Sequence, residues 1–127
     1  MISKAILLLT LAASAASVSA IGHDNTHEVR SLTKNEASVV DFAVRSHLVD
    51  GANAVLTMGG FITKSYDAYC GLVKPSQLDY EMPFFMLLVS YGQGDAFDSA
   101  VNVRIPGNQS EIEIVKKMCN QVGYTIR

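Results

Sequence analysis

Three histidines are the residues of this chain best suited to acid–base or metal chemistry, and all of them lie in its first half. His23 and His27 are four residues apart, which on a helix would bring both imidazoles to one face and suit a metal ion. The residues around them do not favour a helix. We therefore predict that about residues 21–30 form a solvated N-terminal arm that holds no metal.

The third histidine, His47, is the better candidate for a general base. It falls on the apolar side of a helix that the surrounding periodicity predicts. A histidine in such a position is more often partly buried and hydrogen bonded than catalytic. We therefore expect His47 to support the packing of that helix.

Acidic side chains near the predicted turns are the other group suited to acid–base chemistry, as in the carboxylate pairs of glycoside hydrolases. They are Asp67, Asp79, Glu81, Asp95 and Asp98. Acids at turns normally favour solubility and turn formation. The chain also lacks G-x-S-x-G, H-E-x-x-H, C-x-x-C, P-loop and EF-hand patterns. These observations predict a protein that is not an enzyme and needs no cofactor.

The two cysteines, Cys70 and Cys119, offer a choice between redox chemistry, metal binding and a disulfide. A metal site needs further ligands, and a catalytic cysteine needs a histidine partner with no second thiol close by. An exported chain with two distant cysteines is expected to form one intramolecular disulfide. Closing a loop of about 50 residues should stabilise the fold by about 4 kcal/mol.

The first twenty residues predict that export. Lys4 precedes an apolar run over 5–13, and small residues at 18 and 20 fit a signal-peptidase site. We expect residues 1–20 to be a cleaved signal peptide and residues 21–127 to be a single small secreted domain. The domain would be extracellular, or periplasmic in a bacterium, with no membrane insertion after cleavage.

Two amphipathic helices should supply the rigid elements of the domain. Thr33 and Glu36 have the spacing of a capping box, and apolar residues follow at helical intervals. Asp50 and Gly51 supply a stop, so we predict a helix over about 33–50.

A second capping box at Ser110 and Glu113 predicts another helix, which places Cys119 on its apolar face. Gly123 should end this helix, and residues 124–127 favour a short terminal strand.

Residues 54–73 fit either a helix or strands. Their apolar residues follow a helical period in part, but Gly59 and Gly60 would each cost a helix about 1 kcal/mol. Threonine and aromatic residues favour strands, and a glycine pair fits a bulge or bend within them. We therefore predict strand.

The clearest local signal is a β-hairpin. Residues 84–91 are apolar, 92–96 have turn chemistry and 97–105 alternate, while 74–83 should form a connecting loop. The alternation sets Val101, Val103 and Ile105 on one face and Ala100, Asn102 and Arg104 on the other. The unbroken apolar run before the turn indicates a central strand that is covered on both sides.

The order of these elements predicts an α+β fold: a small antiparallel sheet with two helices packed on one face and one disulfide. An all-α fold is the alternative, in which the glycines and prolines only kink helices.

Aromatic and methionine side chains around the predicted strand ends suggest a recognition patch, although the same residues would also complete a small core. They are Tyr66, Tyr69, Tyr80, Met82, Phe84, Phe85 and Tyr91. Asn108, Gln109 and Ser110 form an N-glycosylation sequon in a predicted turn, which only a eukaryotic host would use.

The chain carries 10 Lys and Arg residues against 12 Asp and Glu residues, a formal net charge of −2. Loss of Lys4 with the signal peptide makes the charge more negative, which argues against nucleic acid or an anionic membrane as partner. We expect a secreted protein that binds another protein or extracellular macromolecule, as inhibitors, immunity proteins and effectors do. The alternative is a small secreted hydrolase or toxin that acts on an extracellular polymer.

Overall fold

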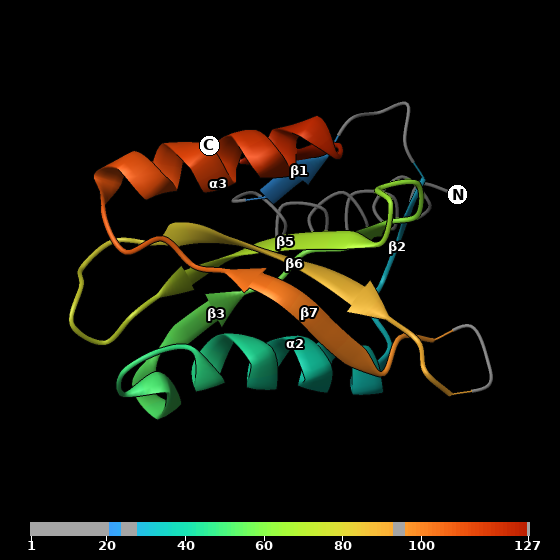
Figure 1. The fold of residues 1–127 in the computed structure, drawn as a ribbon, viewed down its shortest axis with the longest axis horizontal. Coiled ribbons are helices and arrows are strands. Elements are labelled where there is room, and N and C mark those ends of the chain that lie inside the picture. Colours follow the sequence, from blue (N-terminus) through green and yellow to red (C-terminus); the bar gives the residue numbers. More distant parts are fainter. Residues whose placement is uncertain (1–20, 24–27, 93–95, 127) are drawn as a thin grey trace, which may run out of the picture.

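The computed structural model describes residues 21–23, 28–92 and 96–126. The expected signal peptide over 1–20, the histidine His27 and the hairpin acid Asp95 lie outside the described residues. Along the chain the elements are β1 (Ile21–His23), β2 (Val29–Arg30), α2 (Lys34–Ser46), the 3-10 helix η2 (Gly51–Asn53), β3 (Val55–Thr57), β4 (Phe61–Ile62), β5 (Ala68–Lys74), β6 (Met82–Val89), β7 (Ser99–Arg104), α3 (Gln109–Gln121) and β8 (Tyr124–Ile126) (Figure 1).

The centre of the fold is an antiparallel four-stranded sheet in the order β3-β5-β6-β7. The predicted hairpin is formed by β6 and β7, with Leu87 opposite Val101. The ambiguous segment 54–73 forms strands, so the α+β fold is confirmed and the all-α alternative is wrong. Two further two-stranded sheets pair β1 with β8 and β2 with β4.

The predicted N-terminal arm is therefore partly wrong. His23 lies in β1, opposite Tyr124 of β8, and Arg30 lies in β2, opposite Phe61 of β4. Backbone pairing orders these short segments because β8 and β4 each offer a strand edge to them.

Helix α2 begins as expected and ends earlier. The Thr33 hydroxyl accepts the Glu36 backbone N–H at 3.1 Å, and the Glu36 carboxylate accepts the Thr33 N–H at 2.9 Å, which completes the capping box. The helix ends at Ser46, because the chain folds back and Arg45 binds the carbonyl oxygens of Gly51 and Ala54 at 2.8 and 2.7 Å. A β-carbon at Gly51 would lie 2.1 Å from the Arg45 carbonyl oxygen, so this return needs glycine.

Helix α3 has a different cap from the one predicted. The Asn108 side chain, and not Ser110, accepts a hydrogen bond from the first turn, from the Glu111 N–H at 3.0 Å. Asparagine is a strong N-cap because its carboxamide oxygen reaches the free N–H groups of the first turn. The end of the helix is as expected: Gly123 has a φ of 105°, and β8 follows.

The two helices lie on opposite faces of the central sheet, so their expected placement on one face is wrong (Figure 1). Cys70 on β5 is bonded to Cys119 on α3, and Cys70 shares its sheet face with Phe85. Leu88, three residues further along β6, therefore faces the other side, where Ala100 opposite it adjoins α2.

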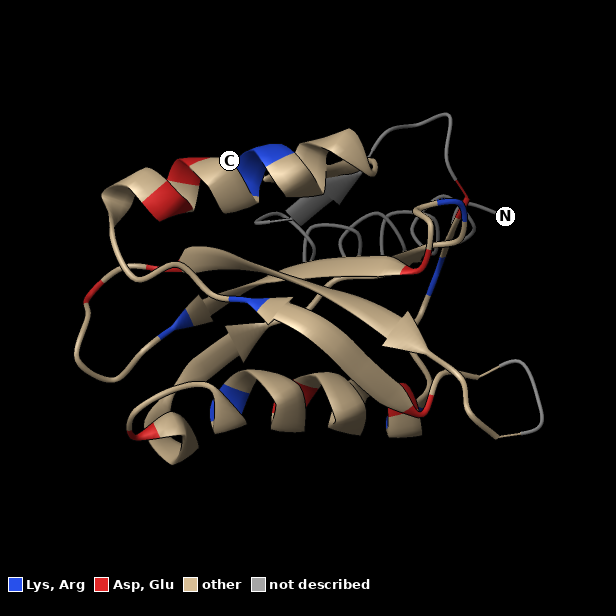
Figure 2. Cartoon of the chain, in the orientation of Figure 1, with Lys and Arg blue, Asp and Glu red and all other residues tan. Residues whose placement is uncertain are grey.

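Strand β6 explains this arrangement. Its residues from Met82 to Met86 are all buried, and neighbouring side chains point to opposite faces. An apolar strand of this kind needs a cover on each side. Charged residues accordingly lie on helices, loops and strand ends, and none lies within β6 (Figure 2).

The alternation predicted for β7 is interrupted by a β-bulge. Arg104 lies opposite Phe85 and Val101 opposite Leu87, so four residues of β7 lie opposite three residues of β6. Asn102 takes a φ of 54° at this point. In a regular strand, Val103 would lie on the same sheet face as Val101. The bulge places Val103 instead on the face of Ala100, which packs toward α2.

The predicted disulfide is confirmed, with both sulfurs buried in the core. It joins positions 49 residues apart in sequence and ties α3 to the middle of the sheet. Among the described residues, no helix is long and apolar enough to cross a membrane.

Candidate functional site

Four members of the expected aromatic patch lie in the core. Tyr69, Met82, Phe84 and Phe85 are buried, because β5 and β6 are covered on both faces. The Tyr69 hydroxyl donates to the Gly59 carbonyl oxygen at 2.8 Å, and burial raises the pKa of its phenol. These four side chains therefore stabilise the fold and cannot form an exposed surface.

The three remaining members are exposed but do not form one patch. Tyr66 and Tyr91 are 88% and 77% exposed at one end of the sheet, where the Leu88 N–H donates to the Asp67 carbonyl oxygen at 2.8 Å. Tyr80 lies in the loop between β5 and β6, at the opposite end.

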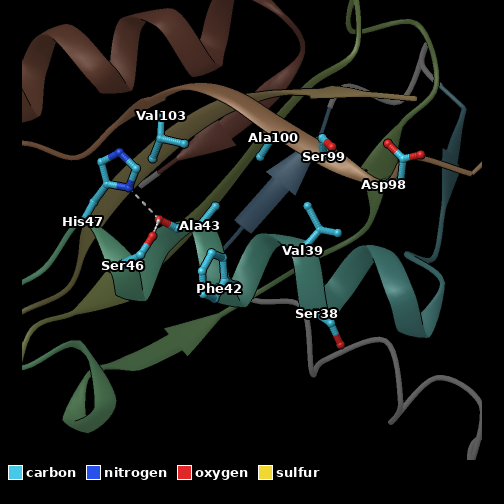
Figure 3. Close-up of a pocket in the computed structure, with 10 residues that line it drawn as sticks. All are labelled: Ser38, Val39, Phe42, Ala43, Ser46, His47, Asp98, Ser99, Ala100 and Val103. Atoms are coloured by element: carbon cyan, nitrogen blue, oxygen red, sulfur yellow. Dashed lines mark hydrogen bonds between the residues drawn. The ribbon is translucent and has the colours of Figure 1, made fainter. Parts of the chain in front are cut away.

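A groove with a largely apolar lining lies between α2 and β7 and has a volume of about 520 Å³ (Figure 3). Small and apolar side chains make up its walls and polar residues mark its ends. Its lining residues are Ser38, Val39, Phe42, Ala43, Ser46, His47, Asp98, Ser99, Ala100 and Val103.

Phe42 is the largest apolar side chain of this groove and is 74% exposed. The apolar stripe that predicts the helix does not include Phe42, although the sequence contains a signal for it. Phe42 is four residues from both Ser38 and Ser46, so it interrupts a polar stripe of the helix with an aromatic ring. An aromatic residue on the polar face of an amphipathic helix indicates a contact outside the helix's own core packing.

His47 lies at one end of the groove and is exposed, which corrects the expected packing role. Its Nδ1 lies 2.8 Å from the Ala43 carbonyl oxygen. That oxygen can only accept, so Nδ1 donates the proton. The helix ends at Ser46, one residue earlier, and His47 at the C-cap position leaves the apolar stripe.

Asp98 lies at the other end, and its carboxylate is occupied by the hairpin backbone. It accepts the N–H groups of Tyr91 and Gly92 at 3.0 and 2.9 Å. Several hydrogen bonds hold the pKa of Asp98 below its usual range, and the bond from the Tyr91 N–H contributes the most. This carboxylate therefore stabilises the hairpin and is not poised as a general acid.

The outer edge of β7 borders the groove, and no described strand pairs with it. Along a strand of an antiparallel sheet, one residue directs both its N–H and its C=O to the strand on one side, and the next residue directs both to the other side. Leu88 directs its N–H to Asp67, on the β5 side. Ala100, directly opposite Leu88, therefore directs its own N–H and C=O to the free edge.

An ion pair between the buried Glu36 and the partly exposed Arg30 sets the position of α2 beside this edge. The Glu36 carboxylate accepts two bonds from the Arg30 guanidinium at 2.7 and 2.9 Å and one from the Phe97 N–H at 3.0 Å. Arg30 lies over the Phe61 ring at 4.8 Å. The guanidinium lowers the pKa of Glu36 to about 2, with help from the backbone donors at Phe97 and Thr33.

The other acids considered for catalysis are dispersed. Asp67 is in the turn before β5, and Asp79 and Glu81 are in the loop before β6, where Glu81 accepts the Thr57 hydroxyl at 2.9 Å. Within the described ranges, no three His, Cys, Asp or Glu residues are grouped to hold a metal ion. Comparison with family models, curated proteins and solved structures found no match to this chain.

Proposed function

We propose that this protein is a secreted, non-enzymatic binder that holds an extended segment of a partner protein in the groove between α2 and β7. Phe42 carries this proposal, because it is 74% exposed in an apolar groove beside a sheet edge that no described strand covers. Large aromatic side chains in concave apolar surfaces are typical anchors of protein recognition.

The edge of β7 supplies hydrogen bonds for such a segment. An added strand would pair with the outward N–H and C=O of Ala100 and extend the sheet. Its side chains on the α2 side would contact Phe42 and Val39, so backbone pairing and apolar contact act together. The bulge at Asn102 limits regular pairing to the first half of β7. The expected contact is therefore short and depends strongly on its side-chain anchor.

The two ionisable groups of the groove support binding over hydrolysis. His47 donates its Nδ1 proton to a backbone carbonyl, and Asp98 accepts two backbone N–H groups. Both are engaged with the protein's own backbone at opposite ends of the groove (Figure 3). A general acid and base acting on one bond must both reach it.

Secretion is supported by the predicted signal peptide over 1–20 and is compatible with the buried disulfide between Cys70 and Cys119.

The test is capture of the partner with tagged mature protein from the native extracellular or periplasmic fraction, followed by chemical crosslinking. Phe42→Asp should abolish capture because it places a charge in the apolar contact. Ala100→Pro should weaken capture at least tenfold because it removes the outward N–H. Proline is tolerated on an edge strand where the N–H faces solvent.

Ile114→Asp is the matched control, because Ile114 is a 49% exposed apolar residue on α3, outside the groove. It should capture the partner as the wild type does. A partner retained equally by Phe42→Asp and wild type, or a folded wild-type protein that retains none, would contradict the proposal.

A further inference from the structure

The N-terminus of α3, from its N-cap Asn108 onward, presents an acceptor motif that lies outside the groove. Asn108, Gln109 and Ser110 have the form N-x-S with no proline at the middle position, and all three are exposed. None of residues 105–110 lines the groove between α2 and β7. A modification here would leave the proposed binding surface open.

The cap of α3 fixes how the Asn108 carboxamide is turned. Its Oδ1 accepts the Glu111 N–H at 3.0 Å, and an N–H group can only donate, so the oxygen must face the helix. The Nδ2 group therefore points away from the helix. Glu111 itself is occupied by the Gly107 N–H, which donates to its Oε1 at 2.6 Å. No described residue forms a hydrogen bond with the Asn108 Nδ2.

We propose that Asn108 is N-glycosylated in a eukaryotic secretory pathway and that the same side chain continues to cap α3. The co-reactant is a polyprenyl-diphosphate-linked oligosaccharide. A bond forms between Nδ2 and the anomeric carbon, and the bond from that carbon to the diphosphate oxygen breaks. The diphosphate leaves with the electron pair, and the amide proton passes to a base of the transferase.

The product is compatible with the folded helix cap. Glycosylation replaces one hydrogen on Nδ2 and leaves Oδ1 as an amide oxygen, so the bond to the Glu111 N–H is retained. The transfer needs the sequon, whereas the cap needs only the Asn108 oxygen. Variants can therefore separate the two roles.

The experiment expresses the full chain in secreting eukaryotic cells and measures the intact mass of the protein from the medium and from cell extract. The wild type should carry a glycan mass that peptide-N-glycosidase removes, with conversion of Asn108 to aspartate. Ser110→Ala should lack the glycan and keep the cap. A wild-type protein without glycan in both fractions, beside a glycosylated reference protein from the same cells, overturns the proposal.

Three variants made in bacteria, without glycan, test the second role. Asn108→Asp keeps an N-cap oxygen and should retain the Tm of the wild type within about two degrees. Ser110→Ala should do the same. Asn108→Ala should lower Tm by about five degrees. Equal Tm values for Asn108→Ala and Asn108→Asp would show that the carboxamide does not cap the helix and would overturn the dual role.

Discussion

The two faces of the central sheet are covered in different ways. On one face, α3 is fastened covalently through Cys119, and the Tyr124 hydroxyl of β8 donates to the Ala68 carbonyl oxygen at 3.0 Å. On the other face, α2 buries Val40 and Val44, and Glu36 in its first turn accepts the N–H of Phe97, two residues before β7. Further along α2, Phe42 stays exposed in the groove.

This difference separates stability from recognition. The α3 face is closed by a disulfide and contributes chiefly to the stability of the domain. The α2 face is held firmly at the Glu36 end and left open beside the edge of β7. A surface that binds a partner must be uncovered in the free protein, and a rigid neighbouring contact keeps it pre-organised.

The largest expected effect is loss of the covalent attachment of α3. Replacing both Cys70 and Cys119 by alanine should lower the free energy of unfolding by about 4 kcal/mol, because the unfolded chain gains the freedom of a long loop. Urea unfolding followed by circular dichroism measures it. A loss below about 1 kcal/mol would show that α3 is held by packing alone and would remove the contrast between the two faces.

The next effect concerns the attachment of α2. Glu36→Ala should destabilise the protein by about 3 kcal/mol, because the Thr33 and Phe97 N–H groups lose their acceptor and Arg30 loses its ion pair. Glu113→Ala, at an exposed position on α3, is the control and should change stability by less than about 0.5 kcal/mol. Equal effects of the two substitutions would show that the Glu36 contacts do not hold α2.

Acid should weaken the α2 attachment selectively. The pKa of Glu36 is about 2 in the folded protein against 4.5 in the unfolded chain. A lowered pKa gives stability that is complete above about pH 5 and is lost as the pH falls from 4.5 toward 2. At pH 3 the loss should be about 2 kcal/mol relative to pH 7.

Urea unfolding of wild type and Glu36→Gln at both pH values isolates this contribution. Glu36→Gln should show a pH dependence smaller by about 2 kcal/mol, since it has no proton to gain at this position. Identical pH dependence of the two proteins would assign the acid sensitivity to other groups.

A smaller effect is expected in the groove. Phe42→Ser should change the free energy of unfolding by less than about 0.5 kcal/mol, because the ring is already exposed, while it removes partner capture. A loss above about 2 kcal/mol would show that Phe42 belongs to the core and that the groove is not a free surface.

The smallest effect should come from His47. His47→Leu removes the bond between Nδ1 and the Ala43 carbonyl oxygen at an exposed position, so Tm should change by no more than about two degrees. Partner capture should be retained. A folded His47→Leu protein that has lost a measurable biological activity would instead indicate a functional imidazole and favour the hydrolase alternative.

Much of the local structure was predictable because its signals are local. The Thr33 and Glu36 side chains each accept the other residue's backbone N–H within one turn, and the apolar strand β6 and the alternating strand β7 that pairs with it are close in sequence. The cap of α3 was misplaced by two residues because Asn108 and Ser110 are both good N-caps, and the choice depends on where the chain leaves the turn after Pro106.

The candidate site was less predictable, because exposure is decided by several elements together. The sequence pattern around Tyr69 and Phe84 fits a core and a surface patch equally well. Both side chains are buried because other elements pack on both faces of β5 and β6. His47 left the apolar stripe because Arg45 draws the chain back toward α2. The groove itself needs α2 and β7, which are more than 50 residues apart, to lie side by side.

The sequence alone determined the α+β class, the capping box of α2, the β6–β7 hairpin and the pairing of the only two cysteines. These follow from hydrophobic period, turn chemistry and the presence of a single possible thiol partner, which act over short distances or leave one choice. Only the tertiary structure decided that the helices lie on opposite faces and that Phe42 remains uncovered. Those outcomes depend on which helix packs on each of the two apolar faces of β6. Side-chain periodicity within one element shows that a face is apolar but does not specify which element packs against it.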